Sequence, residues 1–161
     1  MSKKPTPTGR VRGKDLIVTR SFKAPIEDVW ESVTKSERTE RWFGRWEGTP
    51  GAGNTIRFLM VFEKGDAWQE AVIDTCDAPR HLELTSKGEY GAHMELRLRE
   101  DNGTTHLEFV HHLRDGQSAG DYGPGWEYYF DNLVAYRAGE QLPVFEDYYP
   151  SQKEYFLAQV T

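Results

Sequence analysis

The sequence has a single cysteine among its 161 residues, and it lacks long apolar runs. One cysteine, Cys76, cannot form a disulfide within the chain, which is typical of proteins from a reducing compartment. No run of about 18 apolar residues could span a membrane, and no apolar segment follows the basic start as it would in a secretory leader. We therefore expect a cytoplasmic protein without a membrane span.

Basic charge is scarce as well. The 20 Lys and Arg residues stand against 26 Asp and Glu residues, which gives a formal net charge of −6. A domain that binds nucleic acid usually carries a basic face, so we expect no nucleic-acid partner.

The spacings that mark metal sites are also missing. The chain contains no C-x-x-C, H-E-x-x-H or EF-hand pattern. The adjacent His111 and His112 would point to opposite faces of a strand. His81, His93, His106 and His112 alternate with apolar residues, so we expect them in solvent. The sequence therefore predicts neither a metal nor a cofactor.

Aromatic side chains, in contrast, are abundant. The chain has 5 Trp, 8 Tyr and 8 Phe residues, or 13% of its length. A chain of this size buries about 68–70% of the surface that its unfolded form exposes, which is enough for a core without a disulfide or a metal. The length predicts one domain, and the aromatic content suggests that the rings gather in one core or pocket.

The first third of the chain predicts a tail, a strand and two short helices. Residues 1–13 hold few apolar side chains and are expected to form a disordered N-terminal tail. Apolar and β-branched residues predict a strand over 16–22, and the spacing of apolar residues predicts an amphipathic helix over 26–33. Ser36 is placed to N-cap a second helix that ends near Phe43.

Five further strands and a long helix are expected after a glycine-rich loop. Apolar patterning predicts strands within 56–62, 81–85, 93–99 and 106–113, and two turns, at 64–66 and 77–80, bound another strand over 68–76. An aromatic stripe predicts a long helix, with Pro124 in its first turn and Gly139 at its end. Residues 141–161 are expected to form a C-terminal extension that packs on the domain.

Several short motifs together point to a family. They are Ser21-Phe22-x-Ala24-Pro25-x-x-x-Val29-Trp30-x-x-x-Thr34, then Trp42, Gly51-x-Gly53, the alternating run to His111, and Gly125-Trp126. In the order and spacing of these motifs the sequence resembles the activator of heat-shock protein 90 ATPase homologue-like family, a branch of the START-like superfamily. The resemblance covers about residues 14–139.

The resemblance implies an α+β helix-grip fold of the START-like, Bet v type over residues 14–140. In this fold a curved antiparallel sheet, here of about six strands, wraps around a long C-terminal helix. Two short helices follow the first strand, and a cavity lies between sheet and helix. Members of the superfamily commonly bind lipids, polyketides or other apolar small molecules. Chaperone activation is not implied, because in eukaryotic co-chaperones it depends largely on a separate N-terminal domain.

The candidate site is the cavity that this fold implies. Alternation places apolar side chains of the strands and of the long helix on facing surfaces. The predicted lining residues are Phe58, Met60, Phe62, Glu70, Met94, Leu96, Phe109, His111, Leu113, Trp126, Tyr129, Phe130 and Leu133. Mostly apolar walls with a few polar groups are typical of a small-molecule site, and an ordinary packed core is the alternative.

His111 is the most informative polar residue, because alternation places its imidazole among apolar side chains, where an unpaired polar group costs free energy. It could orient a carbonyl or hydroxyl group of a ligand. Alternatively, it could bond to Tyr129, Glu70 or a backbone carbonyl and only maintain the shape of the site. Trp42 and Trp46 could likewise gate the cavity or cap the core.

These features predict a non-catalytic domain that binds an apolar or aromatic small molecule between the sheet and the long helix. One alternative is a co-chaperone-like module whose surface, with its aromatic C-terminal extension, contacts a chaperone or a second copy of the chain. Another is an enzyme of the polyketide cyclase or aromatase type, with Glu70 and His111 as acid and base. Binding is preferred because the sequence reveals no set of nucleophile, base and orienting residue.

Overall fold

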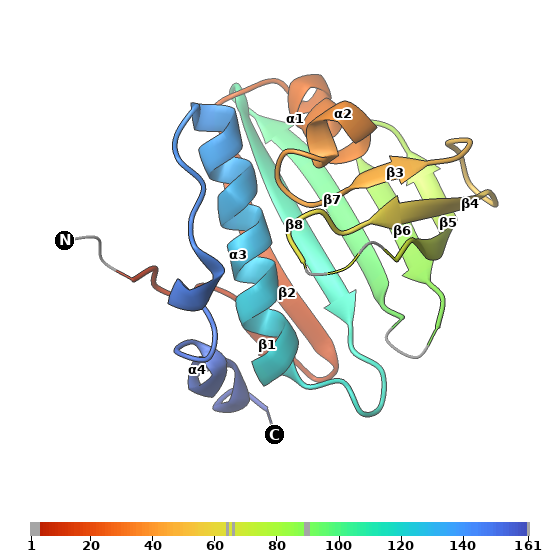
Figure 1. Cartoon of the computed structure of the whole chain (residues 1–161). Helices are drawn as coiled ribbons and strands as arrows, with labels where there is room; N and C mark the ends of the chain where they lie inside the picture. The colour runs from red at the N-terminus through yellow and green to blue at the C-terminus, as the bar shows by residue number, and fades with distance from the viewer. Residues whose placement is uncertain (1–3, 64, 66, 89–90, 161) are drawn as a thin grey trace.

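The alternating apolar residues fold into one antiparallel sheet that curves around a long helix (Figure 1). The computed structural model describes residues 4–63, 65, 67–88 and 91–160. Within these residues, eight strands follow the order β1-β2-β8-β7-β6-β5-β4-β3. The strands are β1 (Arg10–Arg12), β2 (Asp15–Phe22), β3 (Arg45–Glu47), β4 (Thr55–Leu59), β5 (Gln69–Asp77), β6 (His81–Ser86), β7 (His93–Asp101) and β8 (Thr104–His112). The helices are α1 (Ile26–Thr34), α2 (Ser36–Thr39), α3 (Ala119–Ala138) and α4 (Lys153–Leu157), with a 3-10 turn, η1, at Phe145–Asp147.

The α+β helix-grip fold predicted from the sequence is confirmed, with two more strands than expected. The additional strands, β1 and β3, have three residues each and lie at the two edges of the sheet. Pairing with one neighbouring backbone holds them, so they need no alternating pattern of their own. Residues 1–13 therefore differ from the expected tail, because Arg10–Arg12 pair with β2. Residues 1–3 lie outside the described residues.

The wedge, which we define as α1, α2 and the turn to Gly44, lies beside β3 at one end of the sheet (Figure 1). Ser36 does not cap α2, because Lys35 occupies the N-cap position. Instead, the Ser36 hydroxyl donates to the carbonyl of Trp46 at 2.8 Å and accepts from its backbone N–H at 2.9 Å. These bonds fasten the wedge to β3.

The long helix α3 begins earlier than the sequence indicates. Ser118 caps its N-terminus by accepting from the backbone N–H of Gly120, so Pro124 lies in the second turn rather than the first. The helix ends at Gly139, as predicted, in the left-handed conformation (φ 70°) that glycine adopts without strain. No helix within the described ranges is both long and apolar enough to cross a membrane.

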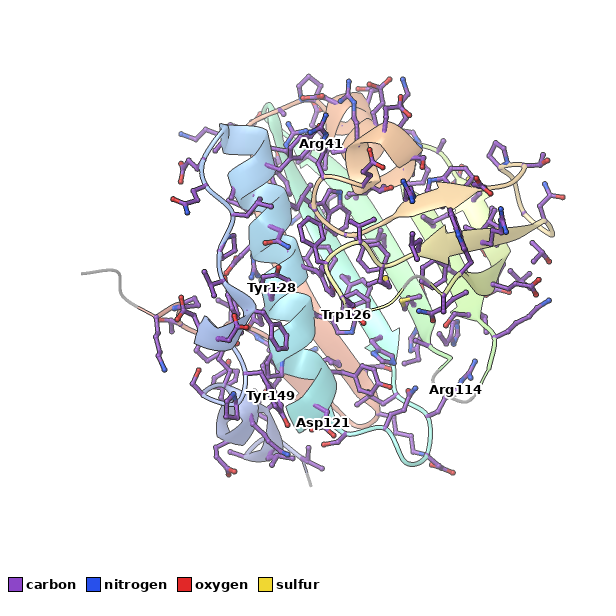
Figure 2. All side chains as sticks on the ribbon, in the orientation of Figure 1. Arg41, Arg114, Asp121, Trp126, Tyr128 and Tyr149 are labelled. Carbon is purple, nitrogen blue, oxygen red and sulfur yellow. The ribbon has the colours of Figure 1, made fainter. Side chains whose placement is uncertain are left out.

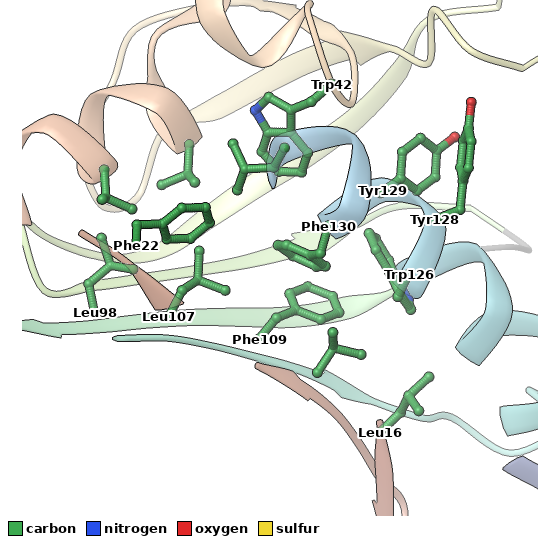
Figure 3. Close-up of a cluster of buried hydrophobic side chains, with 14 of the residues drawn as sticks. Leu16, Phe22, Trp42, Leu98, Leu107, Phe109, Trp126, Tyr128, Tyr129 and Phe130 are labelled. Atoms are coloured by element: carbon green, nitrogen blue, oxygen red, sulfur yellow. The ribbon is translucent and has the colours of Figure 1, made fainter. Parts of the chain in front are cut away.

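The main core lies between α3 and the concave face of the sheet (Figure 3). Phe130 and Leu133 on α3 are 1% and 0% exposed, and they face inward-pointing residues of β2 and β8 such as Val18 and Phe109. This packing positions one face of α3 along the candidate site.

The C-terminal extension and the N-terminal segment pack beside α3 (Figure 1). The Phe156 ring lies directly against Gly123, where a Cβ would come within 2.5 Å of it. Tyr148, which is 2% exposed, donates its hydroxyl proton to Asp131 at 2.6 Å. The Glu127 carboxylate accepts hydrogen bonds from the backbone N–H groups of Thr8 and Gly9. Two of the aromatic side chains of the extension, Tyr148 and Phe156, are thus buried against the domain.

Candidate functional site

A cavity of about 140 Å³ lies between the wedge, the inner face of strands β4 to β8, and α3. Its walls are almost entirely apolar. Side chains from the wedge, the sheet and α3 all contribute, so the cavity exists only because these three parts of the fold meet there. Figure 2 shows Trp126 on the side of α3 that faces the sheet.

Six of the thirteen predicted site residues line this cavity. They are Phe58, Met94, Leu96, Phe109, Trp126 and Phe130. Five others, Met60, Phe62, Leu113, Tyr129 and Leu133, belong to the adjoining core and not to the cavity wall. Contact between any of these residues and a ligand stays a prediction.

Glu70 requires a correction in position, because it does not face the cavity. It is exposed on β5 opposite Arg57 of β4, and its carboxylate lies 3.5 Å from the ammonium group of Lys87. The next residue, Ala71, is fully buried, so alternation turns Glu70 to the opposite face of the sheet. A role for Glu70 as an acid inside the cavity is therefore not supported by its position.

Cys76 is a lining residue that alternation does not reveal. The register of β5 against β6 shifts between Ile73 and Thr75, which marks a bulge. Because a bulge inserts one residue, both Ile73 and Cys76 face the cavity although they are three positions apart. The exposed thiol of Cys76 lies opposite Leu82, at the outer part of the wall.

An aromatic belt forms the wall next to α3. The belt, defined as Trp42, Phe43, Phe109, Trp126 and Phe130, has ring centroids 4.4 to 6.0 Å apart between successive neighbours. Figure 3 shows Phe109 of β8 facing Phe130 and Trp126 of α3. Such distances are those of favourable aromatic pairs. The sequence identified only the three rings on β8 and α3 as lining residues.

The two tryptophans near the wedge both line the cavity, and both have their indole nitrogens bonded. Trp42 donates to the carbonyl of Ser32 at 2.9 Å, and Trp46 donates to the carbonyl of Thr34 at 2.7 Å. These bonds fix the rings as walls. Trp42 is only 4% exposed, which fits a core-capping position better than a movable gate.

His111 is fully buried but does not line the cavity. The indole N–H of Trp126 donates to Nδ1 of His111 at 3.1 Å, and Nε2 lies 3.0 Å from the side-chain oxygen of Gln117. An indole can only donate, so Nδ1 accepts and Nε2 carries the proton. Burial lowers the pKa of His111 to about 4, and both nitrogens of the neutral ring have protein partners. The structure thus places His111 in the shape-maintaining arrangement, with partners other than those considered from the sequence.

Tyr129 ties a loop to α3 beside the cavity. Its hydroxyl donates to the carboxylate of Glu63, which lies in the loop between β4 and β5. Burial raises the pKa of Tyr129, and the bond to Glu63 raises it further, so the hydroxyl stays protonated. Figure 1 shows this loop passing close to α3. We call this bond the latch.

Comparison with known proteins identifies the same fold. A model of the family described as Activator of Hsp90 ATPase homolog 1-like protein matches residues 23–138. Among solved structures, the crystal structure of CalU16 from Micromonospora echinospora is 26% identical, with a TM-score of 0.75. The match covers 90% of this chain and 87% of CalU16. No curated protein matches the chain.

Two more distant structures show the fold alone. A protein from Bordetella parapertussis, solved by NMR, is 22% identical with a TM-score of 0.72, over 96% of this chain and 90% of its own. DynU16, described as a protein in the dynemicin biosynthetic locus, is 19% identical with a TM-score of 0.70. That match covers 86% of this chain and 51% of DynU16, so this chain corresponds to about half of it.

Proposed function

The chain belongs to the family of Activator of Hsp90 ATPase homolog 1-like proteins, and on this premise we propose that it binds a flat apolar or aromatic small molecule in the cavity. The observation that carries the proposal is the aromatic belt, whose rings face an open volume with apolar walls. A flat ring entering this volume gains contact with the belt and leaves water, and both contributions favour binding.

The size of the cavity sets the size of the enclosed group. An apolar cavity of about 150 Å³ in another protein binds benzene, so a volume of about 140 Å³ holds a single ring. Drug-sized ligands occupy pockets of about 300–1,000 Å³. A larger ligand would therefore place one ring against the belt and extend past the exposed Cys76, or it would displace Phe43.

Binding is a better supported function than catalysis. The two residues considered as acid and base do not meet in the cavity, since Glu70 is exposed on the other face and both nitrogens of His111 are engaged. A proton-transferring group must reach the reacting atom within hydrogen-bond distance. Neither group has that access here, so binding without chemistry is the function that we infer.

A co-chaperone role through the C-terminal extension receives less support. Its Tyr148 and Phe156 are 2% and 0% exposed and pack on α3. Four large apolar side chains of the extension, Val144, Phe145, Tyr155 and Val160, are between 38% and 52% exposed. Because Tyr148 and Phe156 are buried, the extension offers a partner less apolar area than its aromatic content suggests.

The first experiment measures binding by the full chain. Native mass spectrometry of the purified protein would detect a co-purified molecule. Isothermal titration calorimetry would then test naphthalene, 2-naphthol, the flavonoid naringenin and decanoate as probes. Trp126 lines the cavity, so we also expect its fluorescence to change when an aromatic probe binds. We expect the aromatic probes to bind more tightly than decanoate.

Cavity-filling variants give this experiment its control. Leu96→Trp adds a large side chain inside the cavity, whereas Val134→Trp adds one at a 40% exposed position of α3. We expect Leu96→Trp to abolish binding and Val134→Trp to leave it unchanged, with circular dichroism confirming that both fold. If Leu96→Trp does not fold, Met94→Phe is the smaller substitution at the same wall. Equal binding by both folded variants would refute the proposal.

A further inference from the structure

The face of the sheet that points away from α3 carries histidines and carboxylates on adjacent strands. Met94 and Leu96 of β7 line the cavity, and alternation turns the side chains of His93 and Glu95 to the other face, although Glu95 also borders the cavity between its two neighbours. His112 of β8 lies on that face too, because it is the direct cross-strand partner of His93. Adjacent strands thus bring together residues that are distant in the sequence.

Three of these side chains form a compact set. The imidazole centroids of His93 and His112 are 4.5 Å apart, and Nε2 of His112 lies 2.7 Å from a carboxylate oxygen of Glu95. One ligand atom from each of the three side chains lies within 4.8 Å of the others. Zinc bonds of about 2.0–2.2 Å place tetrahedral ligands about 3.4 Å apart, so small side-chain rotations would close this set around an ion.

We propose that His93, Glu95 and His112 bind one divalent transition-metal ion, preferably zinc, with the remaining coordination position taken by water. Two imidazoles and one carboxylate are a known zinc ligand set when a fourth position is left open. The same donors suit nickel and copper, whereas magnesium and calcium prefer oxygen ligands alone. The proposal departs from the sequence-based expectation of no metal.

The surroundings of the three side chains are those of a metal site. Asp15 lies 2.7 Å from Nδ1 of His112, so it can hold the ring with Nε2 turned toward Glu95. Glu83 bonds to Nε2 of His93 and accepts from Thr75 at 3.3 Å through its other oxygen. Carboxylates that orient metal-binding histidines in this way raise metal affinity.

The local charge also favours a cation. Three carboxylates, those of Asp15, Glu83 and Glu95, lie at the cluster, and both Arg97 and His81 bond to the Glu95 carboxylate at 2.9 Å. Glu95 is partly shielded from water, with 11% of its side chain exposed. A divalent ion would replace the proton that His112 and Glu95 share and would balance the excess negative charge.

The test uses the full chain after removal of metals with EDTA. Calorimetric titration with zinc chloride should show one bound equivalent for the wild type, and Co²⁺ should give the visible absorption of a four-coordinate site. His93→Gln combined with His112→Gln should remove both signals. Asp15→Asn should weaken zinc binding by about 10-fold to 100-fold, since it removes only the orienting carboxylate.

The matched control is His106→Gln. His106 is on β8, on the same face as His112, but six residues away, or about 20 Å along the strand. It bonds to Ser21 instead of to the cluster. This variant should bind zinc as the wild type does, and circular dichroism checks the fold of every variant.

Two outcomes would overturn the proposal. One is a wild-type chain that binds no zinc or cobalt, which would leave the cluster as an ion-pair network. The other is undiminished binding by the folded double variant, which would place the ion elsewhere, for example at the exposed thiol of Cys76. Neither outcome affects the proposed ligand cavity, because His93 and His112, the two residues replaced in the test, do not line it.

Discussion

The indole nitrogen of Trp126 donates to Nδ1 of His111 at 3.1 Å, and this bond joins a ring that lines the cavity to a histidine that does not. Gln117 holds the other nitrogen of His111 and also donates to the backbone carbonyl of Gly91 at 2.9 Å. The chain of bonds runs from the loop before β7 through the loop before α3 to the cavity wall. His111 is therefore a positioning residue for Trp126.

Replacing His111 should destabilise the fold and loosen the Trp126 ring. His111→Ala leaves the buried indole N–H without an acceptor and opens a cavity, which together should cost about 3 kcal/mol in the free energy of unfolding. His111→Gln can still accept from the indole through its amide oxygen and should cost less. Urea denaturation measures both variants. Equal destabilisation by Ala and Gln would contradict the positioning role.

The contribution of His111 should also depend on pH. Burial lowers its pKa in the folded state to about 4 from the ordinary value of 6.5. The folded state thus resists protonation, so the stability that neutral His111 contributes is fully present above pH 6.5 and declines as the pH falls toward 4. The decline is about 1.4 kcal/mol per pH unit within this window.

This dependence is measured as a difference between two proteins. The free energy of unfolding of the wild type and of His111→Gln is measured at pH 7.0 and pH 5.0, in buffers that contain EDTA. Subtracting one protein from the other cancels the titration of all other groups to first order. We expect the advantage of the wild type to be about 2 kcal/mol smaller at the lower pH. An advantage that is the same at both pH values would show that His111 does not remain neutral in the folded state.

The latch between Tyr129 and Glu63 should control how long a ligand stays in the cavity. Tyr129→Phe removes the hydroxyl that holds the β4–β5 loop to α3, at a cost of about 1 kcal/mol. If the loop must open for release, dissociation should be about fivefold faster. Stopped-flow measurement with an aromatic probe tests this rate.

A matched control for the latch lies on the same helix. Tyr136 of α3 is partly exposed, and within the described part of the chain its hydroxyl forms no hydrogen bond. Tyr136→Phe should therefore leave the dissociation rate unchanged. Equal rates for the wild type, Tyr129→Phe and Tyr136→Phe would show that the loop does not limit release.

The main layers of the fold follow from local patterns in the sequence. A run of apolar and β-branched residues identifies β2, alternation or flanking turns identify β4 to β8, and Gly139 marks the end of α3, because these signals depend only on neighbouring residues. The edge strands β1 and β3 depend on a partner strand, so local patterns do not reveal them. Pro124 was misleading, because Ser118 starts α3 one turn earlier than the proline suggests.

The candidate site is harder to predict from the sequence, because its residues are brought together by the register between neighbouring strands. A bulge between Ile73 and Thr75 brings Cys76 to the cavity, and no local signal marks it. The pairing of His93 with His112 requires the register of β7 against β8. In the sequence His112 stands next to His111, which points to the other face, and nothing local relates His112 to His93. The sequence pattern therefore does not predict that His93 and His112 lie side by side.

The contact between Gly123 and Phe156 should make two glycines of α3 respond oppositely to the same substitution. In Gly123→Ala the new Cβ would lie 2.5 Å from the Phe156 ring, so the C-terminal extension must shift, at a cost of about 1–3 kcal/mol. Apart from its chain neighbours and the adjacent helix backbone, no described atom lies within 4 Å of the Cβ position of Gly125, and Gly125→Ala should stabilise α3 by about 0.5–1 kcal/mol. Thermal unfolding measures both effects.

The penalty at Gly123 should shrink in a Phe156→Leu background, because the leucine side chain is smaller than the ring that blocks the methyl group. If both alanine variants were equally stable, the extension could not be packed against α3 as described.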